Sequence, residues 1–128
     1  DAKWMEFMLN QIVSNSIKYK DKTKAESYIK ISAAEDKKCI VLEILDNGIG
    51  INASDLPRVF DKSFTGENGH EYSKATGMGL YIVKKLCDKL GSKVSIESVN
   101  GEYTRVKITF YKNDFYKEIT DSNESGSM

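Results

Sequence analysis

The stretch "ILDNGIGI", residues 44–51, decides how the chain folds. It runs from apolar, mostly β-branched residues into an acid, an amide and two glycines, which predicts a buried strand followed by a turn. Asp46 would end the strand, where its carboxylate could accept a hydrogen bond. Gly48 and Gly50 would let the backbone approach a flat ring closely. A plain turn accounts for the same residues, so the interpretation depends on the rest of the chain.

Composition limits the class of protein. The chain has 128 residues, 19 basic and 19 acidic, which suits one domain with a real core and gives no long-range attraction to nucleic acid or an acidic membrane surface. Cys39 and Cys87 show no CxxC spacing, so we expect free, reduced thiols in a cytosolic setting. There is no run long enough for a membrane helix and no signal peptide. The chain starts in mid-pattern without an initiating Met, as a fragment of a larger protein would.

Hydrophobic periodicity predicts a two-layer α/β sandwich. Apolar residues spaced by threes and fours predict helices over residues 2–20, including Trp4 and Ile17, and over 78–90, where Gly91 ends the helix. Two strand pairs are expected, with helices on one face of a mixed, largely antiparallel sheet. The predicted strands cover residues 28–34, 39–45, 93–99 and 104–111.

The connections are predicted in less detail. Residues 52–60 suit a short helix with Asn52 or Ser54 as its cap and Pro57 near its first turn. Residues 61–76 form a long polar loop, which we expect to be functional or mobile. We assign residues 1–111 to the folded domain and residues 112–128 to a disordered tail.

Polar residues on the first predicted helix suggest a cation site. Gln11, Asn15 and Lys18 are spaced by four and three, so they share one face. A solvated helix face would show the same pattern. A half-buried Asn, however, needs a partner, and a hydrated divalent cation that bridges phosphates would serve because Mg²⁺ takes oxygen ligands.

Two later segments add features that are each ambiguous alone. In "TGMGL", residues 76–80, Gly77 and Gly79 open a helix whose unpaired N–H groups would suit phosphate, but the spacing is neither that of a Rossmann turn nor that of a P-loop. Phe60 precedes the polar loop, and Phe64 lies four residues later. Such pairs usually belong to a core, but here they could anchor the base of a closing lid.

Taken in order, these segments resemble the GHKL, or Bergerat-fold, ATP-binding domains, and most of all the catalytic domain of bacterial sensor histidine kinases. "NQIVSNSIKYK" is similar to the asparagine box, "DNGIGI" to the first glycine box, "VFDKSF" to the phenylalanine box and "TGMGLYIVKKL" to the second glycine box. "GEYTRVKITF" is similar to the last glycine-Thr strand pair. The likeness covers roughly residues 4–111. The sequence of residues 64–81 resembles the corresponding sequence of the intramembrane-sensing kinases that respond to antimicrobial peptides.

The resemblance implies a site for ATP and Mg²⁺. Asn15 would ligate Mg²⁺ with Gln11 nearby, and Asn15 and Lys18 would act on the phosphates as the catalytic residues. Asp46 would bind the adenine amine, with Thr104 assisting through water. The loop 61–76 would be the lid over the nucleotide. The other implied nucleotide contacts are Tyr19, Gly48, Ile49, Gly50, Phe60, Lys62, Lys74, Gly77, Met78, Gly79 and Leu80.

Three positions depart from the family pattern. ATP-hydrolysing relatives place a glutamate four residues before the metal-binding asparagine, whereas this chain has Gln11, which cannot accept a proton near neutral pH. We therefore expect little hydrolysis and transfer to a protein histidine instead. Tyr103 replaces a frequent glycine before the final Thr. The usual lid arginine is not evident, and His70, Lys62 or Lys74 would have to stand in for it.

The resemblance also implies partners that the chain does not contain. His70 lacks the acidic neighbour and helical hairpin of a phosphoacceptor, so we expect the chain to bind ATP without phosphorylating itself. Its partners would be its own dimerisation and phosphotransfer domain and a response regulator, with no nucleic acid. The domain would be cytoplasmic and free of the membrane, in a homodimeric parent held in the bacterial cell membrane. The alternatives are a DNA-repair or chaperone-type ATPase, an anti-sigma serine kinase, and a degenerate kinase that only binds partners.

Overall fold

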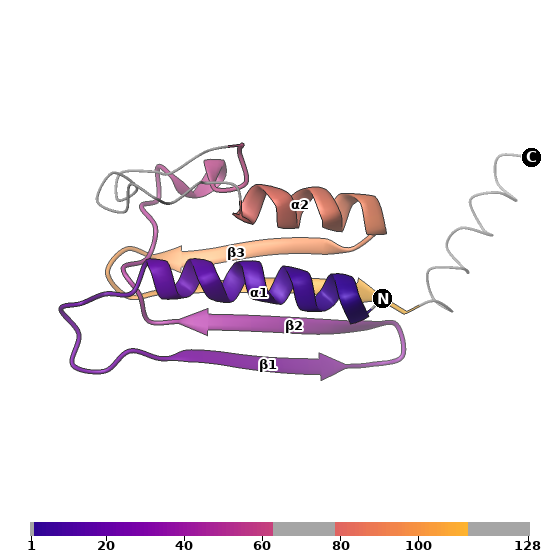
Figure 1. Ribbon diagram of the computed structural model, residues 1–128, viewed down its shortest axis with the longest axis horizontal. Helices are drawn as coiled ribbons and strands as arrows, with labels where there is room; N and C mark the ends of the chain where they lie inside the picture. The colour runs from indigo at the N-terminus through magenta and orange to yellow at the C-terminus, as the bar shows by residue number, and fades with distance from the viewer. Residues whose placement is uncertain (1, 63–78, 113–128) are drawn as a thin grey trace, which may run out of the picture.

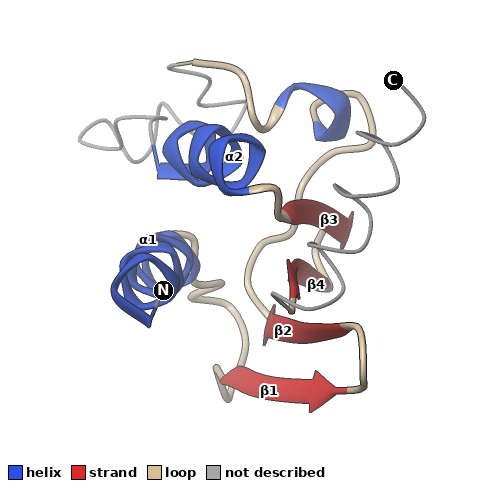
Figure 2. Ribbon diagram, turned by 90° about the vertical axis from the view of Figure 1, so that its right-hand side faces the viewer, coloured by secondary structure: helices blue, strands red, loops and turns tan. Residues whose placement is uncertain are grey.

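The computed structural model describes residues 2–62 and 79–112, which form a layer of helices on a layer of strands (Figures 1 and 2). The order of elements along the chain follows the sequence-based expectation closely. The elements are α1 (Ala2–Lys18), β1 (Ile29–Glu35), β2 (Cys39–Asp46), the 3-10 helix η1 (Leu56–Arg58), α2 (Gly79–Leu90), β3 (Lys93–Val99) and β4 (Tyr103–Tyr111).

The sheet has the strand order β1-β2-β4-β3. Two hairpins, β1–β2 and β3–β4, join through the central pair β2–β4, and all three pairings are antiparallel. We expected a mixed, largely antiparallel sheet, and over the described residues the sheet is wholly antiparallel. In the central pair Asp46 stands opposite Thr104, so the polar end of β2 lies beside the start of β4.

The core lies between this sheet and the two helices. Alternate residues of β2 and β4 face the helices, because side chains in a strand alternate between its two faces. The opposite face carries charge, with Arg105 Nε and Lys107 Nζ 3.6 and 3.8 Å from the Glu43 carboxylate. The buried apolar residues are Met8, Ile12, Leu42, Ile44, Val59, Leu80, Val83, Cys87, Val94, Val106 and Ile108.

The structure corrects several expectations about α1. The helix ends at Lys18 rather than at residue 20, because the Tyr19 carbonyl accepts a hydrogen bond from the N–H of Ile49 at 3.0 Å instead of continuing the helix. Trp4 and Ile17, which were placed on the apolar face, are exposed. The buried residues of α1 are Met8, Ile12 and Ser16, and Ile17 follows about 100° further around the helix, which turns it away from that buried face.

The connection after β2 also differs from expectation. Only Leu56–Arg58 is helical, and neither Asn52 nor Ser54 caps it. Asp55 occupies the cap position, but its side chain makes no capping hydrogen bond, while the Asn52 carbonyl accepts the N–H groups of Asp55 and Leu56. A backbone turn therefore replaces the expected side-chain cap. The expected place of Pro57 in the first turn is confirmed.

Other expectations have varied outcomes. Both cysteines are free, as expected, and Cys87 is buried in the core. Burial raises the pKa of the Cys87 thiol to about 11.

Across residues 2–62 and 79–112 the structure contains no helix with the length and apolar character needed to cross a membrane. Residues 63–76 of the expected lid and residues 113–128 of the expected tail lie outside the described residues.

Two isoleucines of α1 offer a matched test of this packing. Ile12 is 1% exposed and Ile17 is 62% exposed. We expect Ile12→Ala to lower the free energy of unfolding by about 2–5 kcal/mol, because it leaves a cavity under the helix. We expect Ile17→Ala to change it by no more than about 0.5 kcal/mol. Denaturant unfolding of both variants measures this, and equal losses would contradict the placement of α1 on the sheet.

Candidate functional site

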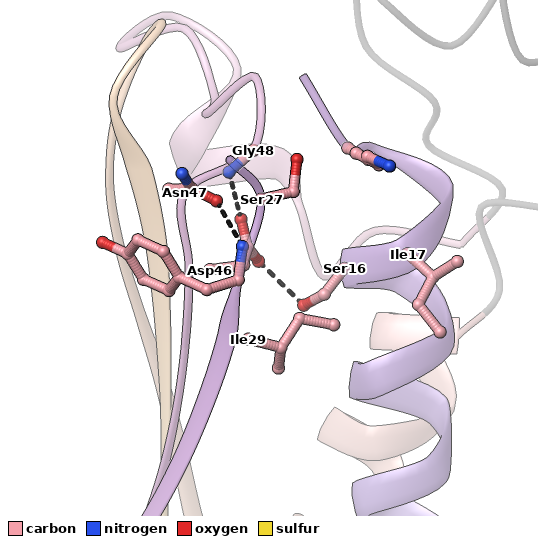
Figure 3. A pocket seen from close by; sticks show the side chains of 9 residues that line it. Ser16, Ile17, Ser27, Ile29, Asp46, Asn47 and Gly48 are labelled. Atoms are coloured by element: carbon pink, nitrogen blue, oxygen red, sulfur yellow. Dashed lines mark hydrogen bonds between the residues drawn. The ribbon is translucent and has the colours of Figure 1, made fainter. Parts of the chain in front are cut away.

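Asp46, the last residue of β2, is a buried acid under the end of α1. It is 7% exposed, and both of its carboxylate oxygens accept a hydrogen bond from the chain. The Ser16 hydroxyl donates to Oδ2 at 2.7 Å, and the Gly48 N–H donates to Oδ1 at 2.9 Å (Figure 3). A helix and a turn therefore hold one carboxylate in a fixed orientation, and each of its oxygens keeps a further lone pair.

Burial sets the protonation behaviour of this acid. Loss of hydration raises the pKa of Asp46 above its ordinary value of 3.8. The hydrogen bonds from Ser16 and Gly48 and the charge of Lys24 act in the opposite direction and limit the rise. Because the folded-state pKa exceeds the unfolded one, the stability that a protonated Asp46 confers is present below pH 3.8 and is lost as the pH rises through the higher value.

The glycine turn after Asp46 is held between α1 and the β3–β4 turn. The Ile49 N–H donates to the Tyr19 carbonyl at 3.0 Å, and the Gly101 N–H donates to the Ile49 carbonyl at 2.7 Å. The backbone of a single residue, Ile49, therefore connects three segments that are distant in the sequence. The backbone of residues 47–50 is fixed where the site needs it.

Both glycines of this turn are required by space. A Cβ on Gly48 would lie 2.5 Å from the Tyr19 carbonyl oxygen and 2.9 Å from Asp46 Oδ1. Gly50 has φ +73°, which favours glycine, and its Cβ would overlap the Val99 carbonyl. These glycines therefore allow the turn to lie directly against α1 and the end of β3.

Lys24 also stabilises the glycine turn, through hydrogen bonds to backbone carbonyls. Its ammonium donates to the carbonyls of Asn47 at 2.9 Å, Gly48 at 3.4 Å and Glu102 at 2.8 Å. Three acceptors match the three N–H donors of an ammonium group. Lys24 thus ties the turn after β2 to the turn between β3 and β4, and it places a positive charge near Asp46.

Thr104, the expected water-bridging partner, stands opposite Asp46 and is also buried. Its hydroxyl lies 2.9 Å from the hydroxyl of Ser98, which donates to the Tyr103 carbonyl at 2.6 Å and accepts the Ile51 N–H at 2.8 Å. Thr104 is therefore part of a polar network that links β3, β4 and the segment after the glycine turn. The expected water bridge from Thr104 to a base stays a prediction.

The expected phosphate-side residues are only partly brought together. Gln11 reaches α2, since a Cβ on Gly79 would lie 3.5 Å from Gln11 Oε1. Asn15 and Lys18 are half-buried near the end of the same helix. Leu80 is buried and Phe60 packs against the core, whereas Lys62 is exposed. The remaining expected contacts lie outside the described residues: Lys74, Gly77 and Met78.

A cavity of about 340 Å³ opens on the other side of Asp46, between α1 and β1 (Figure 3). Its lining includes Ser16, Ile17, Ile29 and Asp46 but none of Gln11, Asn15 and Gly79. Gln11 and Gly79 meet instead on the side of α1 that contacts α2. Because the Gln11 amide and the start of α2 meet there, we place the candidate site on the α2 side of Asp46.

Sequence analysis missed three polar residues that shape this site: Ser16, Lys24 and Ser98. Ser16 and Lys24 bind groups 30 and 23 or more residues away in the sequence, so local spacing carries no signal for them. Ser98 was visible only as an alternating polar residue of a predicted strand. One signal could have indicated Ser16: it follows the apolar Ile12 by four residues, so it continues the buried face of the helix.

Comparison with known proteins identifies the family of the chain. Residues 1–114 match the family described as "Histidine kinase-, DNA gyrase B-, and HSP90-like ATPase", and the chain belongs to that family. It is homologous to the catalytic domains of sensor histidine kinases, so the ATP-binding role expected from its motifs fits. The resemblance to the kinases stated from the motifs is confirmed.

Named relatives are sensor kinases of similar sequence. The chain is 42% identical over 110 residues to the sensor histidine kinase YxdK of Bacillus subtilis, covering 86% of this chain and 33% of that protein. It is 38% identical over 120 residues to the sensor protein BceS of Halalkalibacterium halodurans, covering 93% of this chain and 35% of that one. The chain therefore spans about a third of the length of these relatives.

Solved structures share the fold. The mycobacterial sensor histidine kinase MprB superposes with a TM-score of 0.71 at 20% identity, covering 87% of this chain and 74% of that chain. Full-length ShkA, solved in complex with AMPPNP, gives a TM-score of 0.67 at 19% identity, covering 83% of this chain and 21% of that one. At this identity the likeness establishes the α/β architecture alone, which confirms the expected fold class.

The two glycines at Gly48 and Gly79 provide a matched stability test. We expect Gly48→Ala to lower the free energy of unfolding by about 1–3 kcal/mol, because its Cβ would overlap backbone and carboxylate oxygens. Among the described residues, Gly79→Ala meets ordinary contacts at 3.5 and 3.9 Å with Gln11, and alanine favours a helix, so its stability should stay within about 1 kcal/mol of wild type. Thermal unfolding compares them, and a Gly48→Ala variant of wild-type stability would contradict the described turn.

The raised pKa of Asp46 predicts a pH dependence. An amine donor on a ligand prefers the ionised carboxylate, so affinity for adenine nucleotides should fall as the pH drops through the raised pKa, and saturation with nucleotide should lower that pKa. Carboxyl-carbon NMR of Asp46, assigned by loss of its signal in Asp46→Asn, measures both effects. A pKa at or below 3.8 in the free chain would contradict the prediction.

Proposed function

We propose that this domain binds Mg-ATP and presents its γ-phosphate to a histidine on another domain of a larger sensor kinase. The observation that carries the proposal is the buried Asp46 carboxylate, each oxygen of which has a second lone pair that none of the described residues occupies, beside a turn that tolerates no side chain. An exocyclic amine of adenine is the donor that such an acceptor suits. The similarity to sensor kinases and the AMPPNP complex of ShkA support the nucleotide.

The base would lie against the glycine turn. Gly48, Ile49 and Gly50 would pass beside the ring, and Tyr19 would line it from the end of α1. Thr104 would assist Asp46 through a water molecule. The bonds from the Ile49 backbone N–H and carbonyl to Tyr19 and Gly101 support this arrangement, because they hold the turn rigid before any ligand arrives.

The phosphates would lie toward the start of α2. Gly77, Met78, Gly79 and Leu80 would offer backbone N–H groups there, and a helix N-terminus favours anions. Mg²⁺ takes oxygen ligands and keeps several waters, so the amide oxygens of Asn15 and Gln11 together with phosphate oxygens suit it. The approach of Gln11 Oε1 to the Gly79 position supports this choice. Lys18, with Lys62 and Lys74, would neutralise phosphate charge.

The reaction needs a partner. Phosphoryl transfer depends on positioning and charge neutralisation, which these residues would supply, with Asn15 and Lys18 acting on the phosphates. The acceptor would be a histidine of the dimerisation and phosphotransfer domain of the same protein, followed by a response regulator. The parent would be a homodimer in the bacterial membrane with this domain on its cytoplasmic side. The names of the relatives support this proposal.

Calorimetric titration with the β,γ-imido analogue of ATP, with and without Mg²⁺, tests the proposal. Wild type should bind, and Asp46→Ala should weaken binding at least about tenfold, because it removes a charge-assisted hydrogen bond. Asn15→Ala should bind but lose the dependence on Mg²⁺. Ser14→Ala, an exposed residue of α1, is the matched control and should bind like wild type. If the folded wild-type chain did not bind the analogue, the proposal would be contradicted.

Hydrolysis distinguishes the alternative within this fold. A gyrase- or chaperone-type ATPase would release phosphate steadily, whereas Gln11 offers no base to activate water. Steady turnover by the wild-type chain would favour the ATPase. An anti-sigma serine kinase would place phosphate on serine rather than on histidine. A degenerate kinase that only binds partners would show neither nucleotide binding nor turnover.

A further inference from the structure

Ser16 carries a buried hydroxyl that donates a hydrogen bond to the acid of the site. It is 8% exposed, lies inside α1, and donates to Asp46 Oδ2 at 2.7 Å across a separation of 30 residues (Figure 3). Serine hydroxyls inside helices commonly bond the carbonyl one turn earlier, and serine is a weaker helix former than alanine. Here the hydroxyl instead makes a tertiary bond, so its effect is exerted on Asp46.

Two donors from different elements fix the plane of this carboxylate. Ser16 takes one lone pair of Oδ2 and the Gly48 N–H takes one lone pair of Oδ1. Rotation about the Cβ–Cγ bond would break both bonds, so the two remaining lone pairs point in fixed directions. Without Ser16, only the short-range bond from Gly48, two residues along the chain, would restrain the group.

The direction of the Ser16 bond also decides what Asp46 can recognise. A hydroxyl that donates to a carboxylate favours the ionised, acceptor-only form. An acceptor-only group binds an amine hydrogen and rejects a carbonyl oxygen, because two acceptors then face each other without a proton between them. A protonated Asp46 would instead be able to donate to such a carbonyl, and the selection would weaken.

We propose that Ser16 is a positioning residue that makes the site select purines with an amine at position 6 over purines with a carbonyl there. The inference rests on the proposed nucleotide function, and it adds a residue that determines base specificity. Ser16 need not touch the base, since its effect passes through Asp46. Replacing it should therefore change the ratio of two affinities more than it changes the binding of the phosphates.

The test compares the β,γ-imido analogues of ATP and ITP, which differ in the group at position 6. Their dissociation constants are measured calorimetrically for wild type, Ser16→Ala and Ser14→Ala. Ser14 is exposed on the same helix, so Ser14→Ala makes the same chemical change away from Asp46. We expect wild type and Ser14→Ala to prefer the adenine analogue by the same factor, and Ser16→Ala to lower that factor about tenfold, the size of a lost charge-assisted hydrogen bond.

Each result has a defined meaning. An unchanged preference in Ser16→Ala, even with a lower melting temperature, would show a merely structural role and overturn the inference while leaving nucleotide binding intact. Equal binding of both analogues by wild type would do the same. Failure of wild type to bind either analogue would overturn the proposed function as well. If Ser16→Ala does not fold, Ser16→Cys keeps the volume with a weak donor and should lower the preference in the same direction.

Discussion

Burial of the Asp46 carboxylate under α1 is the constraint on which the rest of this domain depends. A charge removed from water is costly unless hydrogen bonds compensate for it. The compensating donors come from α1, through Ser16, and from the turn after β2, through Gly48. The helix and the strand end can therefore satisfy this acid only in one relative position, and the apolar contacts of Ile12 and Ile44 must be compatible with it.

The backbone around Asp46 is held as firmly as the side chain. The backbone N–H and carbonyl of Ile49 join the end of α1 to the β3–β4 turn, and Lys24 joins the turn after β2 to the same β3–β4 turn. Such a junction leaves no room for a Cβ at Gly48. A rigid acceptor beside a bare backbone binds a flat ligand without first paying for its own ordering. The same hydrogen bonds that stabilise the turn after β2 therefore also prepare the candidate site for a ligand.

Much of this could be predicted from the sequence, and the exceptions have physical reasons. The strand 93–99 and the place of Asp46 at the end of β2 followed from alternation and from the glycine turn. Ser16 and Lys24 could not be foreseen, because their partners are set by tertiary packing. Ile17 was expected to be buried and is exposed, because the buried face of α1 continues from Met8 and Ile12 to Ser16, a polar residue that gives no apolar signal in the sequence.

A crystal structure of the chain with Mg²⁺ and the β,γ-imido analogue of ATP tests the central claim most directly. The account predicts the 6-amino nitrogen within about 3 Å of an Asp46 carboxylate oxygen, with the bond from Ser16 retained. The triphosphate should run on the α2 side of α1, toward Gln11. A base seated in the cavity between α1 and β1, with no bond to Asp46, would contradict both the assignment of the site and the role given to its buried acid.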